Sequence, residues 1–466
     1  MIELDNIKRV YFVGIGGIGM SAIARYFLSR GAAVSGYDRT ATALTQALEA
    51  EGAAICFTDD LEYLDKAADL VVYTPAIPAT HKQLSWYRQQ GYTVVKRSDV
   101  LGIITRGAFN ICIAGTHGKT SISTMIAHLL RHTGLGCNAF LGGVSVNYNT
   151  NFWSSTSATC VVEADEYDRS FLKLWPNVAI ITSMDADHLD IYGTHEAMQE
   201  AYVLFAKQLK PNGLLVRKAG LTPLDSLSAT RQWHYELHPQ TNAHIYAHNI
   251  RIAQGGYLFD AVINDVELPN IKLNVGGLHN IENMLAAMAV LVYMNAGAEA
   301  ITEAVATYRG VKRRFEYILK PDTMDKHALV VIDDYAHHPD ELDALLKSVR
   351  HLYPNEQITI VFQPHLYSRT QHHAAAFAQV LSQADHVILL PIYAAREAPV
   401  PGVSSQMIAD EIEPGKVQVL DKEACVAYLN TIESGVLITA GAGDIDSLLP
   451  AITTNYQQKL HKQGLN

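Results

Sequence analysis

The chain has 466 residues, of which 48% are hydrophobic, and a formal net charge of −11. Since this length supports two or three separate cores, we expect three domains. The acidic balance argues against binding to duplex nucleic acid, because such binding depends on the neutralisation of phosphates by basic side chains.

Cysteine usage and the apolar segments indicate the compartment. The five cysteines form no CxxC pair, which favours buried thiols in a reducing cytoplasm over a zinc site. The first ten residues lack the apolar core of a secretory signal, and no stretch approaches the roughly 18 apolar residues that a membrane helix needs. We therefore expect a cytoplasmic protein without membrane insertion.

The N-terminal region contains a glycine-rich turn between a predicted strand and an amphipathic helix, within RVYFVGIGGIGMSAIARYFLSRG. Gly14, Gly16 and Gly19 match the GxGxxG spacing, and a second predicted strand ends at Asp38, about 20 residues further along. These glycines allow backbone amides and a helix N-terminus to approach a diphosphate, whichever nucleotide carries it. Alone, the motif favours a nicotinamide dinucleotide, and the alternative is a tight turn without a ligand.

Two further predicted strands complete the first domain, which ends near residue 107. A second strand–loop–helix unit follows, with the loop AGTHGKTS at residues 114–121. The usual phosphate loop has a glycine at the position of Ile113. In this loop Lys119 can reach the outer phosphates of a nucleotide and Thr120 can ligate magnesium. The alternative is an ordinary turn with a solvated lysine.

Polar side chains follow the next two predicted strands, TCVVEADEYD and NVAIITSMDADHLD. The residues at the two strand ends are Glu163, Asp165 and Glu166, and then Asp185, Asp187, His188 and Asp190. Both strands should end at one edge of the sheet, where carboxylates suit the hard oxygen ligands that magnesium prefers. Either segment alone could be a solvated acidic loop, and His188 could equally be a hydrogen-bonded histidine near the core.

The middle of the chain changes character. Residues 220–275 contain alternating segments that predict an antiparallel patch. A helix is predicted next, where Asn280 and Asn283 lie one turn apart and could bind a purine edge or cap the helix. The basic cluster RGVKRRFE follows at residues 309–316.

The last third, from about residue 320, predicts an α/β sheet. Its strands ALVVID, ITIVFQ, HVILLP and GVLITAGAGD each lead into polar residues. In open α/β sheets the loops at the carboxyl ends of the strands carry the site. The residues that would converge there are Tyr335, His337, His338, His365 and Arg369.

At eight places the chain resembles the Mur ligases. The matching segments, in chain order, are GIGGIGMSAIA, AGTHGKTS, EADEYDRSF, DADHLDIYG, GLHNIENMLAA, RRFE, DDYAHHPDE and QPHLYSRT. Eight motifs in the right order are specific, and they extend over nearly the whole chain. Because Mur ligases use the shortened loop GTxGK[TS], the resemblance makes the loop complete and places Ile113 in a buried strand.

The resemblance implies an α/β protein with the three-domain Mur ligase architecture. A Rossmann-like UDP-sugar-binding domain (1–107) would precede a P-loop ATPase domain with an antiparallel patch (108–319) and a Rossmann-like α/β amino-acid-binding domain (320–466). Within the family, the chain is most similar to the branch that joins L-alanine to UDP-N-acetylmuramate in peptidoglycan precursor synthesis. The implied cofactors are ATP and Mg²⁺, and the expected state is a monomer or weak homodimer.

The resemblance also assigns residues to each ligand. The expected UDP-sugar-binding residues, in place of a nicotinamide site, are Gly14, Gly16, Gly17, Gly19 and Asp38. The expected ATP-binding residues are Gly115, Thr116, His117, Gly118, Lys119, Thr120, Ser121, Asn280, Asn283, Arg314 and Asp334. The expected magnesium ligands are Thr120, Glu163 and His188, and the expected amino-acid-binding residues are Tyr335, His337, His365 and Arg369.

The chemistry follows from what amide formation requires. A carboxylate is a poor acceptor for an amine, so the lactyl carboxylate must first take the γ-phosphoryl group as an acyl phosphate. Lys119, Arg314 and the magnesium held by His188 would neutralise charge during this transfer. The alanine amine then attacks and expels phosphate, and either His337 or His365 could accept its proton.

Two positions depart from relatives. Some Mur ligases carry a carbamylated lysine where this chain has Val203, although the alanine-adding branch also lacks it. Many alanine-adding enzymes have a second arginine where this chain has Leu366, which opens glycine or serine as alternatives to alanine. Other readings are a recycling ligase that adds a whole tripeptide, an NAD-dependent oxidoreductase and a nucleotide-binding regulator without turnover.

Overall fold

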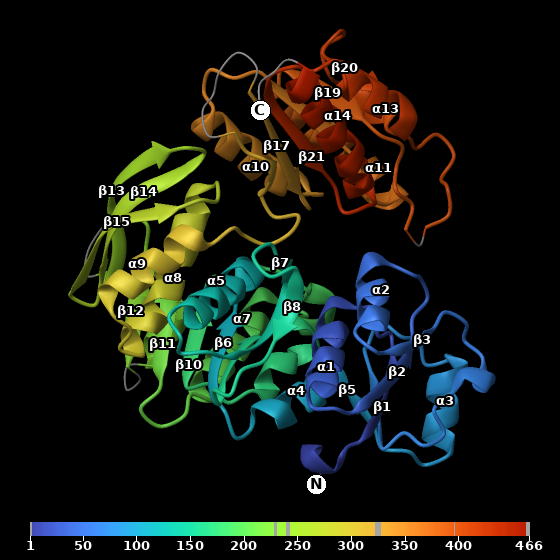
Figure 1. Ribbon diagram of the computed structural model, residues 1–466, viewed down its shortest axis with the longest axis vertical. Helices are drawn as coiled ribbons and strands as arrows, with labels where there is room; N and C mark the ends of the chain where they lie inside the picture. Colours follow the sequence, from blue (N-terminus) through green and yellow to red (C-terminus); the bar gives the residue numbers. More distant parts are fainter. Residues whose placement is uncertain (1, 228–230, 239–242, 322–327, 396, 463–466) are drawn as a thin grey trace. The chain divides into compact units, whose positions relative to one another are not determined.

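The computed structural model describes residues 2–227, 231–238, 243–321, 328–395 and 397–462 (Figure 1). The strands of these residues form three sheets of five, ten and six strands. The chain divides into two compact units. The first unit comprises residues 1–248, 260–271 and 282–307, and the second comprises residues 249–259, 272–281 and 308–466.

The N-terminal sheet is parallel throughout, with the order β3-β2-β1-β4-β5. Its strands are β1 (Arg9–Val13), β2 (Ala33–Tyr37), β3 (Ala54–Cys56), β4 (Leu70–Tyr73) and β5 (Val94–Lys96), and its helices are α1 (Ile18–Ser29), α2 (Ala43–Ala50), α3 (Lys82–Gln89) and α4 (Arg97–Thr105). Because successive side chains of a strand point to opposite faces, Phe12 packs with α1 and α4, whereas Tyr11 packs with α3. The order reverses at β1, so the glycine turn that follows β1 lies at the topological switch point.

The central sheet carries the predicted phosphate loop. Its strands are β6 (Phe109–Ala114), β7 (Asn138–Ser145), β8 (Thr150–Trp153), β9 (Thr159–Glu163), β10 (Val178–Ile181), β11 (Leu214–Lys218), β12 (Gln232–Tyr235), β13 (Ile245–Ala253), β14 (Gly256–Ile263) and β15 (Val266–Leu273). The helices of this region are α5 (Lys119–His132), α6 (Leu189–Tyr192), α7 (His195–Lys207), α8 (Leu278–Tyr293) and α9 (Ala298–Thr307). Strands β9 and β10 flank β6 in parallel, so both acidic strand ends meet the loop at one edge, as predicted.

The region predicted as an antiparallel patch contains two tight turns. Gln254 and Gly255, between β13 and β14, both have positive φ, as do Asn264 and Asp265 between β14 and β15. Two such residues in succession form the type I′ turn of a β-hairpin. The predicted antiparallel patch included β12, but this strand pairs in parallel with both β11 and β13.

The first and central sheets share one hydrophobic cluster within the first unit. Tyr26 of α1 lies with its ring 5.8 Å from that of Phe140 and 6.3 Å from that of Phe152. Beside them, the buried Arg25 donates to Glu51 and to the side chain of Asn151 in β8. The N-terminal domain therefore packs against β7 and β8 through a common core.

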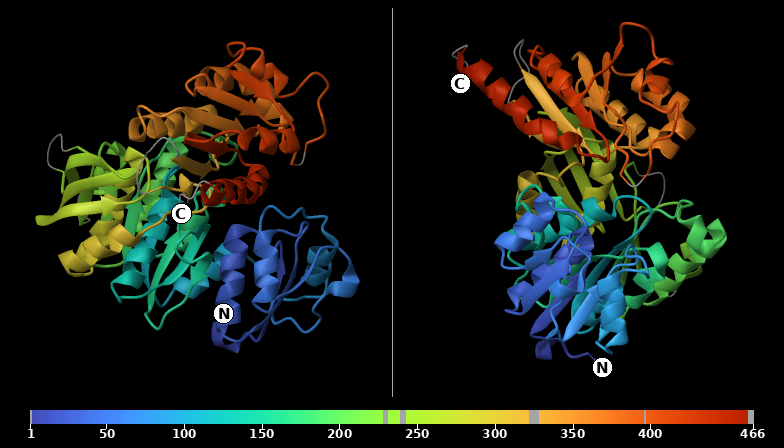
Figure 2. Two further views of the ribbon diagram at one scale, coloured as in Figure 1. Left: turned by 45° about the horizontal axis from the view of Figure 1, so that its top comes forward. Right: turned by 90° about the vertical axis from the view of Figure 1, so that its right-hand side faces the viewer.

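The C-terminal sheet has the order β16-β17-β21-β18-β19-β20, in which only β16 is antiparallel to its neighbour. Its strands are β16 (Glu316–Leu319), β17 (Leu329–Asp334), β18 (Ile358–Phe362), β19 (His386–Leu389), β20 (Val417–Val419) and β21 (Gly435–Ala440), and its helices are α10 (Pro339–Leu352), α11 (Tyr367–Leu381), α12 (Gln406–Ala409), α13 (Lys422–Leu429) and α14 (Leu449–Lys462). Helices α13 and α14 cover one face of the sheet (Figure 2). On the other face, Phe377 of α11 contacts Phe362.

Two expectations from composition concern the thiols and the membrane. Four of the five cysteines are buried, and Cys56 is partly exposed. Burial raises the pKa of the Cys425 thiol to about 12, which disfavours the reactive thiolate. Among the described residues, no helix is both long and apolar enough to cross a bilayer.

Candidate active site

At two positions the loop between β6 and α5 has space only for glycine. Gly115 and Gly118 have φ of +134° and +80°, where other residues are strained. A Cβ atom on Gly115 would lie 2.0 Å from Oγ1 of Thr182, and one on Gly118 would lie 3.0 Å from Oδ1 of Asn283. Asn283, which the resemblance assigns to the nucleotide, therefore lies beside Gly118 of the loop.

Residues after β10 hold the loop in place. Oγ1 of Thr116 lies 2.7 Å from Oγ of Ser183, and the backbone N–H of His117 donates to the same oxygen at 3.0 Å. The hydroxyl of Thr182 donates to the carbonyl of His117. The sequence did not reveal these two supports, because a hydroxyl after a strand is also typical of an ordinary turn.

Lys119 is paired with a buried acid. Its Nζ lies 2.6 Å and 2.8 Å from the two carboxylate oxygens of Glu166, and 2.6 Å from the carbonyl of Gly115. Glu166 is only 1% exposed, and this burial raises the pKa of its carboxyl while the Lys119 ammonium opposes the shift. The cation predicted to meet the outer phosphates is thus held by Glu166.

Glu163, at the end of β9, contacts Thr120 of the phosphate loop. Its carboxylate accepts from the backbone N–H of Gly142 at 2.7 Å, from Ser123 at 3.1 Å and from the Thr120 hydroxyl at 3.3 Å. A Cβ atom on Gly142 would lie 2.3 Å from one of these carboxylate oxygens. Ser123 and Gly142 therefore orient Glu163 toward Thr120, a function that the sequence did not indicate.

A second group of metal-ligating side chains lies beside this pair. Glu166, Asp187 and His188 each offer a ligand atom, and these atoms lie within 4.8 Å of one another. His188 has a left-handed backbone (φ +50°), and its ring lies 5.3 Å from that of Tyr167. Two carboxylates and an imidazole fit a divalent cation. The predicted ligands thus separate into Thr120 with Glu163, and His188 with two acids.

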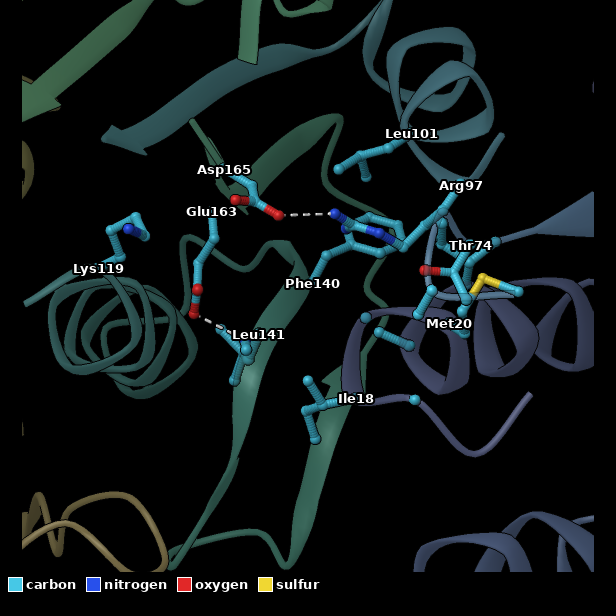
Figure 3. Close-up of a pocket in the computed structure, with 16 residues that line it drawn as sticks. Ile18, Met20, Thr74, Arg97, Leu101, Lys119, Phe140, Leu141, Glu163 and Asp165 are labelled. Atoms are coloured by element: carbon cyan, nitrogen blue, oxygen red, sulfur yellow. Dashed lines mark hydrogen bonds and ion pairs between the residues drawn. The ribbon is translucent and has the colours of Figure 1, made fainter. Parts of the chain in front are cut away.

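A pocket of about 410 Å³ extends from the N-terminal glycine turn to the phosphate loop (Figure 3). The polar side chains that line it are Thr74, Arg97, Lys119, Glu163 and Asp165. Its backbone wall includes Gly17, Ile18 and Gly19 at the start of α1. The pocket therefore connects the glycine turn at the start of α1 with Lys119 of the predicted phosphate loop.

The other predicted UDP-binding residues support the turn. Oδ2 of Asp38 accepts the backbone N–H of Gly16 at 2.7 Å, and a Cβ atom on Gly16 would lie 2.7 Å from Thr45. Gly14 has φ of +90°. Gly14, Gly16 and Asp38 thus shape the loop, while Gly17 and Gly19 line the pocket.

In the second unit, aromatic side chains gather at the carboxyl edge of the sheet. The ring of His337 lies 5.2 Å from that of Tyr335 and 6.0 Å from that of His365. The His365 ring in turn stacks on Tyr393 at 5.9 Å. Within the described residues, Nη1 of Arg369 is buried without a hydrogen-bond partner. The predicted Tyr335, His337 and His365 come together, and Tyr393 joins them.

The remaining predicted nucleotide-binding residues of the second unit differ in burial and in hydrogen bonding. The Asp334 carboxylate accepts two backbone N–H groups at 2.7 Å, from Phe315 and Ala336, and burial raises its pKa to about 6. Asn280 donates to the carbonyl of Gly276. Arg314 has an exposed side chain. Asp334 therefore already has a structural function in its loop.

Family models match most of the chain. They are the Mur ligase family catalytic domain over residues 9–108, the Mur ligase middle domain over 113–291 and the Mur ligase glutamate ligase domain over 313–443. The chain belongs to the Mur ligase family. The three-domain α/β architecture that the resemblance implied is confirmed.

Curated relatives of this Mur ligase include two UDP-N-acetylmuramate–L-alanine ligases. That of Phocaeicola vulgatus is 46% identical over 97% of this chain and 98% of its own length, and that of Flavobacterium psychrophilum is 42% identical over 98% and 100%. The crystal structure of a UDP-N-acetylmuramate-alanine ligase from Thermotoga maritima superposes with a TM-score of 0.80, at 27% identity over 97% of this chain and 99% of that one. A murein peptide ligase from Psychrobacter arcticus, with a TM-score of 0.67 and 22% identity over 96% and 98%, shares the fold.

Proposed function

We propose that this Mur ligase joins L-alanine to the lactyl carboxylate of UDP-N-acetylmuramate, with conversion of ATP to ADP and phosphate. The observation that carries the proposal is the identity of 41–46% with curated L-alanine ligases over almost the whole chain. The pocket between the glycine turn and the phosphate loop supports it. The proposal includes a cytoplasmic location and a monomeric or weakly dimeric state.

In the first step, the lactyl carboxylate attacks the γ-phosphorus of ATP, and ADP leaves. Lys119 would move from Glu166 to the outer phosphates, where its charge offsets the charge of the transferred group. Asn283 would contact the nucleotide, and its proximity to Gly118 supports this assignment. The product is an acyl phosphate, whose phosphate is a good leaving group.

Magnesium fits the acidic side chains that surround the phosphate loop. Thr120 and Glu163 would hold one ion, and Glu166, Asp187 and His188 would hold a second. When bound, these ions would neutralise the phosphate oxygens. Glu166 would then exchange the Lys119 ammonium for a metal ion, so that this buried carboxylate keeps a cationic partner throughout.

In the second step, the amine of L-alanine attacks the acyl phosphate, and a tetrahedral intermediate expels phosphate. Arg369 is proposed to bind the α-carboxylate, because a buried guanidinium nitrogen without a partner is suited to a carboxylate oxygen. His337 and His365, whose rings are neighbours, both remain candidates for the proton acceptor. Arg314 and Asp334 remain candidates for contacts with the nucleotide.

A phosphate-release assay tests the proposal. The protein is given ATP, Mg²⁺ and UDP-N-acetylmuramate, and the nucleophiles L-alanine, glycine, L-serine and the tripeptide L-Ala-D-Glu-diaminopimelate are supplied separately. We expect the highest kcat/KM with L-alanine. A preference for the tripeptide would instead identify a recycling ligase.

A further inference from the structure

The loop that follows β9 has acids directed to two different partners. Glu163 and Glu166 contact the phosphate-loop segment, as described above. Asp165, between them in sequence, bonds to Nη2 of Arg97 at 3.0 Å. A second ion pair, at 2.8 Å, joins Asp168 of the same loop to Lys96. The start of α4 is therefore tied to the acidic loop by two neighbouring ion pairs.

Of the two basic residues, only Arg97 lines the pocket (Figure 3). Its guanidinium also lies beside the first turn of α1, since a Cβ atom on Gly19 would be 3.0 Å from Nη1. Gly17, the residue that caps α1, has no side chain and makes no side-chain cap hydrogen bond to the N–H groups of that turn. An anion at this end of α1 would thus meet the N–H groups of the first turn on one side and a guanidinium on the other.

We propose that Arg97 exchanges partners: an anionic oxygen group of the sugar nucleotide replaces Asp165, to which the guanidinium is bonded in this structure. The inference rests on the proposed function, which supplies the sugar nucleotide. The anionic group is either the diphosphate or the lactyl carboxylate. Each presents two oxygen atoms that can accept parallel hydrogen bonds from a guanidinium.

The existing ion pair is suited to such an exchange. The side chains of Arg97 and Asp165 are 22% and 39% exposed, so water screens their attraction. Asp165 keeps a hydrogen bond after release, because its other oxygen already accepts the backbone N–H of Tyr167 at 3.1 Å. The planar guanidinium of Arg97 offers several N–H donors in a fixed fork, which suits the oxygens of the incoming anion.

Calorimetry on the full-length protein without ATP tests this inference. Arg97→Ala is expected to weaken the binding of UDP-N-acetylmuramate about tenfold or more, and Arg97→Lys to weaken it less. Asp165→Asn removes the competing charge and keeps the acceptor for Tyr167, so it is expected to leave binding equal or tighter. Lys96→Ala is the matched control, because it breaks the neighbouring pair outside the pocket and should leave the affinity unchanged.

The sugar-nucleotide ligand distinguishes the two anions. If the Arg97→Ala penalty also appears with UDP and UDP-N-acetylglucosamine, the diphosphate is the partner. If it appears only with UDP-N-acetylmuramate, the partner is the carboxylate. If both Arg97→Ala and Asp165→Asn bind UDP-N-acetylmuramate more weakly and both melt at a lower temperature, the ion pair serves only to stabilise the fold. That result would overturn the proposed exchange. Wild-type protein that binds no UDP-N-acetylmuramate would instead overturn the proposed function.

Discussion

Nζ of Lys119 lies 2.6 Å from a carboxylate oxygen of Glu166, a residue that is almost completely buried. The lysine that we propose to meet the phosphates of ATP is therefore already paired with an acid within the protein. Nucleotide binding has to break or share this ion pair. A buried acid that loses its cation is costly, so a second cation must approach Glu166 at the same time.

Lys119→Ala should abolish ATP-dependent ligation, with a loss of at least about a thousandfold in kcat, because the γ-phosphoryl group loses a fixed cation. Binding of UDP-N-acetylmuramate should survive, since the site proposed for the sugar nucleotide is at the start of α1. Phosphate release and calorimetry measure the two effects. Near-normal turnover of the variant would contradict the assignment of the phosphate loop.

Glu166→Gln should have opposite effects on two ligands. Without the competing carboxylate, Lys119 is free for phosphate, so a non-hydrolysable ATP analogue should bind more tightly in the presence of EDTA. The loss of one metal ligand should raise the Mg²⁺ concentration required for half-maximal turnover by about tenfold. Titrations of analogue and metal measure both. If neither value changes, Glu166 serves only to fill the core.

Gly142→Ala should impair the metal site without unfolding the protein. Its Cβ atom would overlap the Glu163 carboxylate at 2.3 Å, so the carboxylate must turn away from Thr120. We expect weaker binding of Mn²⁺ in the presence of nucleotide, as measured by electron paramagnetic resonance. Gly107→Ala is the control, because a Cβ atom there meets nothing within 4 Å. Equal metal affinities in the two variants would contradict the proposed site.

Arg369→Ala should raise the apparent KM for L-alanine by roughly 10- to 100-fold and leave the KM values for ATP and UDP-N-acetylmuramate nearly unchanged. The reason is that a charged hydrogen bond to the α-carboxylate is lost. Steady-state kinetics with each substrate varied in turn provide the measurement and its internal controls. Equal effects on all three substrates would refute the assignment.

The buried Asp333 should make the stability of the folded protein depend on pH. Burial raises its pKa to about 7 in the folded protein, from an ordinary value of 3.8. The folded state therefore holds a proton that the unfolded chain releases, and stability falls as the pH rises from about 4 to about 7. Asp333→Asn cannot ionise and keeps an acceptor for Thr439. Its melting temperature relative to wild type should therefore be higher at pH 8 than at pH 5.

The control for this measurement is Asp410→Asn, which removes an exposed carboxylate from the same unit. Its melting temperature should follow that of the wild type across the same pH range. If Asp333→Asn also follows the wild type, the buried carboxyl does not gain a proton on folding.

The elements around the phosphate loop could be predicted because their signals are local. The apolar residues of β6, β9 and β10 form short buried strands, and Gly115, with its positive φ, marks the turn after β6. Parallel pairing of these strands then brings their polar ends to one edge. The parallel pairing of β12 was missed because strand partners are chosen by contacts distant in sequence.

The orientation of each side chain after a strand end could not be predicted. Beyond Glu163 the chain leaves the regular alternation of the strand, and Asp168 and Arg169 take left-handed backbone conformations. No periodicity therefore indicates that Glu166 returns to Lys119 while Asp165 meets Arg97. In the same way, the resemblance assigns Asp38 to the UDP-sugar, and nothing in the sequence indicates that its carboxylate accepts the backbone N–H of Gly16.

The aromatic contact of Tyr26 with Phe140 and Phe152 bears on how this ligase can recombine with its relatives. A crossover near residue 107 would pair one parent's α1 with another parent's β7 and β8, and the side chains of the common core would no longer match. Compensating changes must then arise on both sides at once. Chimeras that inherit residues 1 to about 160 from one parent should accordingly express as soluble protein more often than those joined at residue 107.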